Sequence, residues 1–124
     1  MAALTFDTGA LIALERGEKR IRSVVLAAQE RRAVITVPVV VVAEWWRADT
    51  KRSRLILARI TVEPISERIA RMAGEAIAEV PDATAIDAIV MASAADRGDA
   101  VFTSDHDDLE RLRRRFPEVR VFRV

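Results

Sequence analysis

Hydrophobic positions along this chain of 124 residues follow two periods, a short one typical of β-strands and a longer one typical of amphipathic helices. Short runs rich in β-branched residues alternate with longer stretches in which apolar residues recur every three or four positions. The runs that predict strands cover residues 1–6, 33–37, 60–65, 100–104 and 119–124. The stretches that predict helices cover residues 10–14, 18–32, 38–47, 53–59, 66–80, 84–97 and 108–116.

Strands and helices therefore alternate, and the connections have a length suited to right-handed crossovers between parallel strands. The fold class that this order predicts is α/β, with a four- or five-stranded parallel sheet between layers of helices. A length of 124 residues suits a single domain, so we expect residues 1–124 to form one unit.

One segment, residues 38–47, supports two interpretations. Its four consecutive valines favour a strand by intrinsic preference. Pro38 in front of them and the Ala-Glu-Trp-Trp continuation favour a helix, because proline fits the first turn of a helix. We predict a helix here, which places Glu44 within it.

Composition narrows the chemistry that this chain can perform. Hydrophobic residues make up 51% and charged residues 31%, as in a folded protein rather than a disordered one. The chain has no cysteine and one histidine, which excludes disulfides, thiolate nucleophiles, the common zinc sites and histidine-based triads. Catalysis would therefore depend on carboxylates, hydroxyls and basic side chains.

The same sequence leads us to expect a cytoplasmic protein. The apolar N-terminal run has no basic segment before it, unlike a signal peptide. The most apolar stretch, residues 37–43, is shorter than the roughly 20 residues that span a bilayer. Lys19 and Lys51 are the only lysines among 20 basic residues, although the formal net charge is only +1. Arginine favours bidentate contacts with phosphate or carboxylate, which hints at a nucleic-acid or acidic protein partner.

Four carboxylates stand in apolar surroundings. Asp7 and Asp105 each follow a predicted strand, Glu44 follows the valine run, and Asp87 lies inside the apolar stretch 85–91. We expect each of them to be partly desolvated, and buried carboxylates are costly without a compensating partner. A shared cation is the economical partner, and carboxylates without histidine or cysteine select Mg²⁺ or Mn²⁺. Such a site suits phosphoryl chemistry with an activated water.

Residues near the last of these acids extend the hypothesis. Asp108 lies three residues after Asp105, a spacing that allows both to face one side of a turn. Thr103 can orient a carboxylate or a water molecule as a supporting group. The remaining candidates, which we interpret as turn or solvated loop residues, are Asp82, His106 and Asp107.

Some candidates also have an ordinary structural interpretation. Asp7 precedes Thr8 and a predicted helix, so it can simply cap that helix. Trp45 and Trp46 are adjacent on a predicted helix and point about 100° apart. We therefore expect them to pack in the core or at a homodimer interface rather than to stack on bases.

The order of these residues resembles the PIN-domain ribonucleases, and among them the VapC toxins of bacterial toxin–antitoxin pairs. The resemblance covers essentially the whole chain. The segments that carry it are Asp7-Thr8 after the first strand, Glu44 in a helix after Pro38, Asp87-Ala88-Ile89-Val90, and Thr103-Ser104-Asp105-His106-Asp107-Asp108-Leu109.

The resemblance implies a metal-dependent endoribonuclease that forms a homodimer and is held inactive by a VapB-like antitoxin. Many members of the family have Ser or Asn two positions after the first Asp, where this chain has Gly9, so Thr8 or the backbone would supply one hydrogen bond of the pocket. The implied ligands of Mg²⁺ or Mn²⁺ are Asp7, Glu44, Asp87 and Asp105, with Asp108 as an accessory ligand and Thr103 and Thr8 in support.

Two other functions stay open at this point. A receiver-like signalling module also binds Mg²⁺ in an acidic pocket. In such a module the phosphorylated Asp ends a middle strand and a lysine lies near the last strand. Here Asp87 lies in a predicted helix, and the two lysines lie far from the C-terminus. A PIN-like binding module without catalytic activity would keep the same acids.

Overall fold

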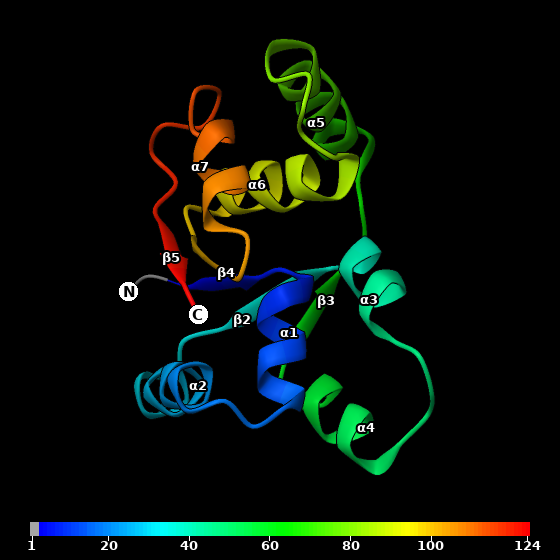
Figure 1. Ribbon diagram of the computed structural model, residues 1–124, viewed down its shortest axis with the longest axis vertical. Coiled ribbons are helices and arrows are strands. Elements are labelled where there is room, and N and C mark those ends of the chain that lie inside the picture. The colour runs from blue at the N-terminus through cyan, green and yellow to red at the C-terminus, as the bar shows by residue number, and fades with distance from the viewer. Residues whose placement is uncertain (1–2) are drawn as a thin grey trace.

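The computed structural model describes residues 3–124 and shows a sheet of five parallel strands with helices on both faces (Figure 1). The order of strands across the sheet is β3-β2-β1-β4-β5. The predicted α/β class and parallel sheet are therefore confirmed, although the strands are shorter than the sequence pattern indicates. Their bounds are β1 (Leu4–Phe6), β2 (Ile35–Pro38), β3 (Thr61–Glu63), β4 (Ala100–Thr103) and β5 (Val121–Arg123).

Seven helices in residues 3–124 fill the connections between the strands. In Figure 1, α1, α2 and α4 lie below the sheet, and α5, α6 and α7 lie above it. Their bounds are α1 (Thr8–Glu15), α2 (Lys19–Arg31), α3 (Val39–Trp45), α4 (Lys51–Leu57), α5 (Glu67–Glu79), α6 (Ala85–Arg97) and α7 (His106–Leu112). Within residues 3–124, no helix has both the length and the apolar character needed to cross a membrane.

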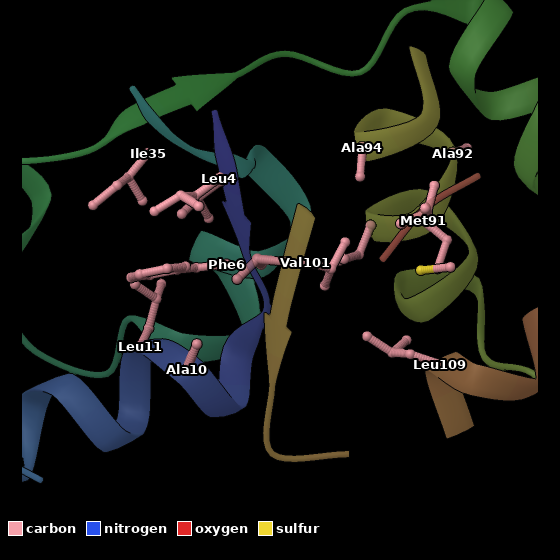
Figure 2. Packing of buried hydrophobic residues seen from close by; sticks show 14 of the residues in the cluster. Leu4, Phe6, Ala10, Leu11, Ile35, Met91, Ala92, Ala94, Val101 and Leu109 are labelled. Atoms are coloured by element: carbon pink, nitrogen blue, oxygen red, sulfur yellow. The ribbon is translucent and has the colours of Figure 1, made fainter. Parts of the chain in front are cut away.

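The core has two parts, one on each face of the sheet, because side chains alternate along a strand. Figure 2 shows Phe6 of β1 pointing toward Leu11 of α1, whereas Val101 of β4 points toward α6 and α7. All three side chains are fully buried, as is Met91 on the α6 side. The two buried layers fix the sheet against its helices and leave the strand ends at the edge where α1 and α7 begin.

Local signals in the sequence position the helices that carry the candidate acids. Thr84 caps α6 by accepting a hydrogen bond from the backbone N–H of Asp87 at 3.1 Å, and Gly98 ends that helix in a left-handed conformation. The valine run is helical, as predicted, because Pro38 stands in front of it and α3 buries Val41 and Trp45 on one face.

The last helix differs from the prediction in both of its ends. β4 ends at Thr103, and α7 begins at His106 instead of residue 108, with the Asp105 carbonyl accepting the N–H of Leu109 at 3.2 Å. The helix ends at Leu112 rather than residue 116, because the following arginines form tighter turn hydrogen bonds. Asp105 therefore stands directly before α7, two residues after the end of β4.

Candidate functional site

Asp7 stands between β1 and α1, where it both caps the helix and faces the other acids. Its Oδ1 accepts a hydrogen bond from the backbone N–H of Ala10 at 2.9 Å, and its Oδ2 accepts one from the hydroxyl of Thr103. The residue is only 3% exposed. The pKa of Asp7 is raised from 3.8 to about 6, mainly by burial and also by the charges of Asp87 and Asp105, against the lowering effect of the two hydrogen bonds. The structural and the functional interpretation of Asp7 are thus compatible.

Asp87 lies in the first turn of α6 and is half-buried. Burial is the main cause that raises its pKa, and the hydrogen bond with Thr84 lowers it. The carboxylates whose charges also raise the pKa of Asp87 are Asp105, Asp108 and Glu44. Acids from four segments of the chain therefore act on Asp7 or Asp87 at one end of the sheet.

Glu44 reaches this group from α3, and Thr8 at the start of α1 donates a hydrogen bond to its Oε1. The side chain is exposed, as is that of Asp105. The expectation that all four main acids are desolvated was therefore wrong for Glu44 and Asp105. Glu44 lies in the last turn of α3, one residue before its end, and Asp105 lies in the turn outside the sheet.

The turn after β4 links the acids to one another. Thr103 is fully buried, and its hydroxyl accepts a hydrogen bond from the backbone N–H of Asp105 at 2.7 Å while it donates to Asp7. Asp108, in the first turn of α7, binds Nη2 of Arg111 through Oδ1 at 2.7 Å. These contacts bring Thr103 together with the acids that sequence analysis selected.

A close approach between two turns explains the residue at position 9. A Cβ atom on Gly9 would lie 1.8 Å from Oγ and 2.7 Å from Cβ of Ser104. Real Cβ atoms do not come this close to other heavy atoms, so a side chain at position 9 requires Ser104 to move. The pocket therefore lacks the Ser or Asn side chain common at this position, and Thr8 makes its hydrogen bond with Glu44 instead.

These side chains have the right chemistry to bind a metal ion, but their spacing does not form a finished metal site. Among residues 3–124, no three His, Asp or Glu side chains gather tightly enough to form a ready-made metal site. The donors are nonetheless carboxylate oxygens. Burial is the main cause that raises the pKa values of Asp7 and Asp87, and repulsion by neighbouring acids adds to it; a hard divalent cation relieves such repulsion. Binding of the ion would have to draw the side chains closer together.

The remaining candidates lie outside this group. Asp82 is exposed in the turn before α6, and Asp107 is exposed with its Oδ1 at 3.3 Å from Nη2 of Arg123. The ring nitrogens of His106 lie 3.6 and 3.8 Å from carboxylates of Asp107 and Glu110. Trp45 is buried and Trp46 is half-buried against it, with ring centroids 5.9 Å apart, so Trp45 belongs to the core.

Sequence reasoning missed a second polar cluster, which lies under α6. Arg97 forms ion pairs with Glu63 at 2.6 Å and with the buried Asp99 at 2.9 Å, and it donates hydrogen bonds to Ser93 and Thr5. Thr5 in turn donates to Asp99 at 2.8 Å. The only sequence signal was an isolated polar residue, Thr5, inside an apolar strand.

Comparison with known proteins identifies the family. A family model of the PIN domain matches residues 4–115, which is most of the chain. The chain belongs to the PIN-domain family. PIN domains are generally nucleases, and they typically use divalent metal ions. No curated protein sequence matches this PIN domain.

Solved structures share the fold of this PIN domain at low sequence identity. VapBC2 from Rickettsia felis, bound to a DNA fragment from its promoter, has a TM-score of 0.78 and 13% identity, with 98% of each chain covered. DNA-bound VapBC from Salmonella typhimurium has a TM-score of 0.76 and 18% identity, covering 99% of this chain and 98% of that one. A toxin–antitoxin complex from Klebsiella pneumoniae has a TM-score of 0.67 and 22% identity, covering 86% and 89%. The predicted resemblance to the PIN-domain family is confirmed, and chains of VapBC complexes share the fold.

Proposed function

We propose that this PIN domain, taken as residues 1–124, is a Mg²⁺- or Mn²⁺-dependent endoribonuclease and the toxin of a VapBC-like toxin–antitoxin pair. The observation that carries the proposal is the electrostatic coupling of Asp7 and Asp87 to the acids around them. Such coupling costs stability, and clusters of perturbed acids are typical of functional sites. A divalent cation bound among the acids would remove the cost.

In the proposed site each side chain has a distinct task. A bound Mg²⁺ or Mn²⁺ would lower the pKa of a water molecule so that it attacks a phosphodiester bond. The buried hydroxyl of Thr103 holds Asp7 in place, and Thr8 does the same for Glu44. The proposed metal ligands are Asp7, Glu44, Asp87 and Asp105, with Asp108 as the accessory ligand.

The partner proposal rests on the fold shared with chains of VapBC complexes and on an open groove. The groove has a volume of about 380 Å³ and runs between α2 and α4, which both lie below the sheet in Figure 1. Leu26 and Leu55, which are 57% and 53% exposed, lie in it beside arginines 22, 52 and 59. Apolar side chains with a basic rim fit an acidic amphipathic segment, as we propose for the antitoxin. We further propose that the toxin is a cytoplasmic homodimer.

The receiver-like alternative does not agree with the fold. Asp87 lies in α6 and not at the end of a middle strand, and both lysines lie in α2 and α4, far along the chain from the last strand. A PIN domain that binds metal without catalysis is the alternative that the experiment must separate from the nuclease.

The test is to incubate the protein, free of antitoxin, with cellular RNA in Mg²⁺, in Mn²⁺ or in EDTA. We expect discrete metal-dependent fragments from the wild type and from Asp82→Asn, whose exposed carboxylate lies in a turn. Asp7→Asn and Asp87→Asn should give none, with folding checked by circular dichroism. Cleavage by Asp7→Asn at the wild-type rate would contradict the assignment of Asp7 to the active site. Metal binding without cleavage of any RNA would favour the binding module.

The groove has its own test, in which the toxin is produced together with its proposed antitoxin. Leu55→Glu places a negative charge among the groove arginines and should release the antitoxin during purification. Val34→Glu, a change at an equally exposed apolar position outside the groove, should leave the complex intact. Release by both variants, or by neither, would contradict this placement of the partner.

A further inference from the structure

Arg111 forms a contact that no other basic residue of the described chain makes. Within residues 3–124, it is the only Lys or Arg in an ion pair with any of the five proposed metal ligands. Its Nη2 lies 2.7 Å from Oδ1 of Asp108, three residues earlier on α7. Asp108 is in turn one of the acids whose charge acts on Asp87. One arginine is thus attached directly to the acidic pocket, on the α7 side.

The contact between Arg111 and Asp108 is weak enough to be exchanged. Both side chains are about half exposed, at 49% and 48%. Exposed pairs at this spacing on a helix contribute only about 0.3–0.5 kcal/mol. A divalent cation held by several carboxylates competes easily with such a pair. Once Asp108 turns to the cation, the guanidinium loses its partner and stands beside a centre of positive charge.

The same pocket presents a difficulty to an RNA chain. Five carboxylates repel phosphates, and one bound metal ion offsets only part of that charge. Arginine is suited to the missing role, because its planar guanidinium binds two oxygens of a phosphate at once. Arg111 lies one helical turn from Asp108, so a phosphate it holds would lie next to the acids.

We propose that Arg111 is a substrate-binding residue with two alternative partners. In the metal-free protein it pairs with Asp108. Once Asp108 has turned to a bound metal ion, Arg111 pairs with an RNA phosphate beside the acidic pocket. This inference rests on the proposed ribonuclease function. It makes metal and RNA binding cooperative, because each ligand lowers the cost of separating the same ion pair. Arg123, whose partner Asp107 is not a proposed ligand, lacks this coupling.

The test uses Arg111→Met and two measurements whose expected changes have opposite signs. Calorimetry with Mn²⁺ and no RNA should show an affinity about twofold higher than in the wild type, because a competing cation is gone. Fluorescence anisotropy with single-stranded RNA in Ca²⁺, after confirming that the RNA stays intact, should show about tenfold weaker binding. The slope of the logarithm of the RNA affinity against the logarithm of the salt concentration should become shallower by about 0.7, the value for one phosphate contact on a single strand.

Controls separate this role from a general effect on charge or folding. Arg71→Met breaks an exposed helical ion pair with Glu67 on α5 and should change neither affinity. Arg111→Lys keeps the positive charge. Its Mn²⁺ affinity should therefore be close to that of the wild type, whereas its RNA affinity should recover only in part. The inference would be overturned if Arg111→Met kept the RNA affinity and salt dependence of the wild type, or if it lost affinity for both Mn²⁺ and RNA. Neither result would affect cleavage by the wild type, so the proposed function would stand. A wild type that neither binds nor cleaves RNA would instead overturn the proposed function, and the inference with it.

Discussion

The hydroxyl of Thr103, at the end of β4, donates a hydrogen bond to Oδ2 of Asp7, at the end of the neighbouring strand β1. The hydroxyl oxygen of Thr103 also accepts the backbone N–H of Asp105 at 2.7 Å, so one buried hydroxyl joins two of the candidate acids. It also opposes the rise that burial causes in the pKa of Asp7. The contact depends on parallel pairing of β1 with β4, because that pairing brings both strand ends to one edge.

Replacing Thr103 by valine tests this contact. The substitution keeps the shape of the side chain but leaves a buried carboxylate oxygen and a backbone N–H without partners, which costs about 1–3 kcal/mol. We expect urea denaturation to show that loss, and Mn²⁺ titration to show weaker binding. Thr103→Ser keeps the hydroxyl and should retain most of the stability and the metal affinity. A valine variant with wild-type metal affinity would contradict the supporting role of Thr103.

Asp7→Asn should stabilise the metal-free protein, and the gain should depend on pH. The folded-state pKa of about 6 lies above the ordinary 3.8, so the folded protein keeps its proton over a range in which the unfolded chain has lost it. Stability from this group is therefore highest below about pH 4 and falls as the pH rises to about 6. Loss of one hydrogen bond limits the net gain to about 1–2 kcal/mol at pH 7.5.

The measurement for Asp7→Asn is urea denaturation in EDTA at intervals from pH 4 to pH 8. The difference from the wild type should grow through this window and level off above about pH 6. A gain that is constant with pH would show that repulsion and burial of the Asp7 charge are not its source. Mn²⁺ affinity of the wild type should rise over the same range, because protons compete for the carboxylate.

Gly9→Ala should destabilise the protein although alanine is the better helix former. The new Cβ would meet Ser104 and push the turn that carries Asp105, at a cost of about 1–3 kcal/mol. Thermal denaturation and the RNA cleavage assay should both show a loss. Ser104→Gly in the same chain removes the two closest atoms and should restore most of it.

Gly74→Ala provides the matched comparison for the change at Gly9. Gly74 lies in α5, and a Cβ there would have no atom within 4 Å. We expect this variant to gain about 0.5–1 kcal/mol from helix preference alone. Equal effects at Gly9 and Gly74 would mean that the contact with Ser104 does not constrain the turn.

Arg97→Met should be the most damaging of these changes to stability. It removes the cation that balances Asp99, whose side chain is almost fully buried, and Glu63, and it leaves Ser93 and Thr5 without a donor. Breaking one partner of a buried ion pair typically costs about 3–5 kcal/mol. Urea denaturation should show this loss, whereas Arg71→Met should stay within about 0.5 kcal/mol of the wild type. A small loss in Arg97→Met would indicate that water replaces the guanidinium.

Local residue patterns were sufficient for the order and type of the elements. The alternation of short β-branched runs with longer helical periods gave all five strands and their helices, because these periods reflect which faces are buried. Pro38 outweighed the strand preference of the valine run, and the cap at Thr84 fixed the start of α6. The end of α7 was predicted less well, since a run of arginines carries no apolar period to mark where the helix stops.

The sequence by itself determined that Asp7, Glu44, Asp87 and Asp105 each follow or interrupt an apolar segment, because that property belongs to neighbours along the chain. Only the tertiary structure decided that β1 lies between β2 and β4, so that α3, α6 and the turn after β4 bring their acids toward Asp7. It also decided that Asp105 and Glu44 are exposed and that Arg97 and Asp99 meet Thr5 under α6. These contacts join residues far apart in sequence, and their energies depend on distance and burial, which no local pattern records.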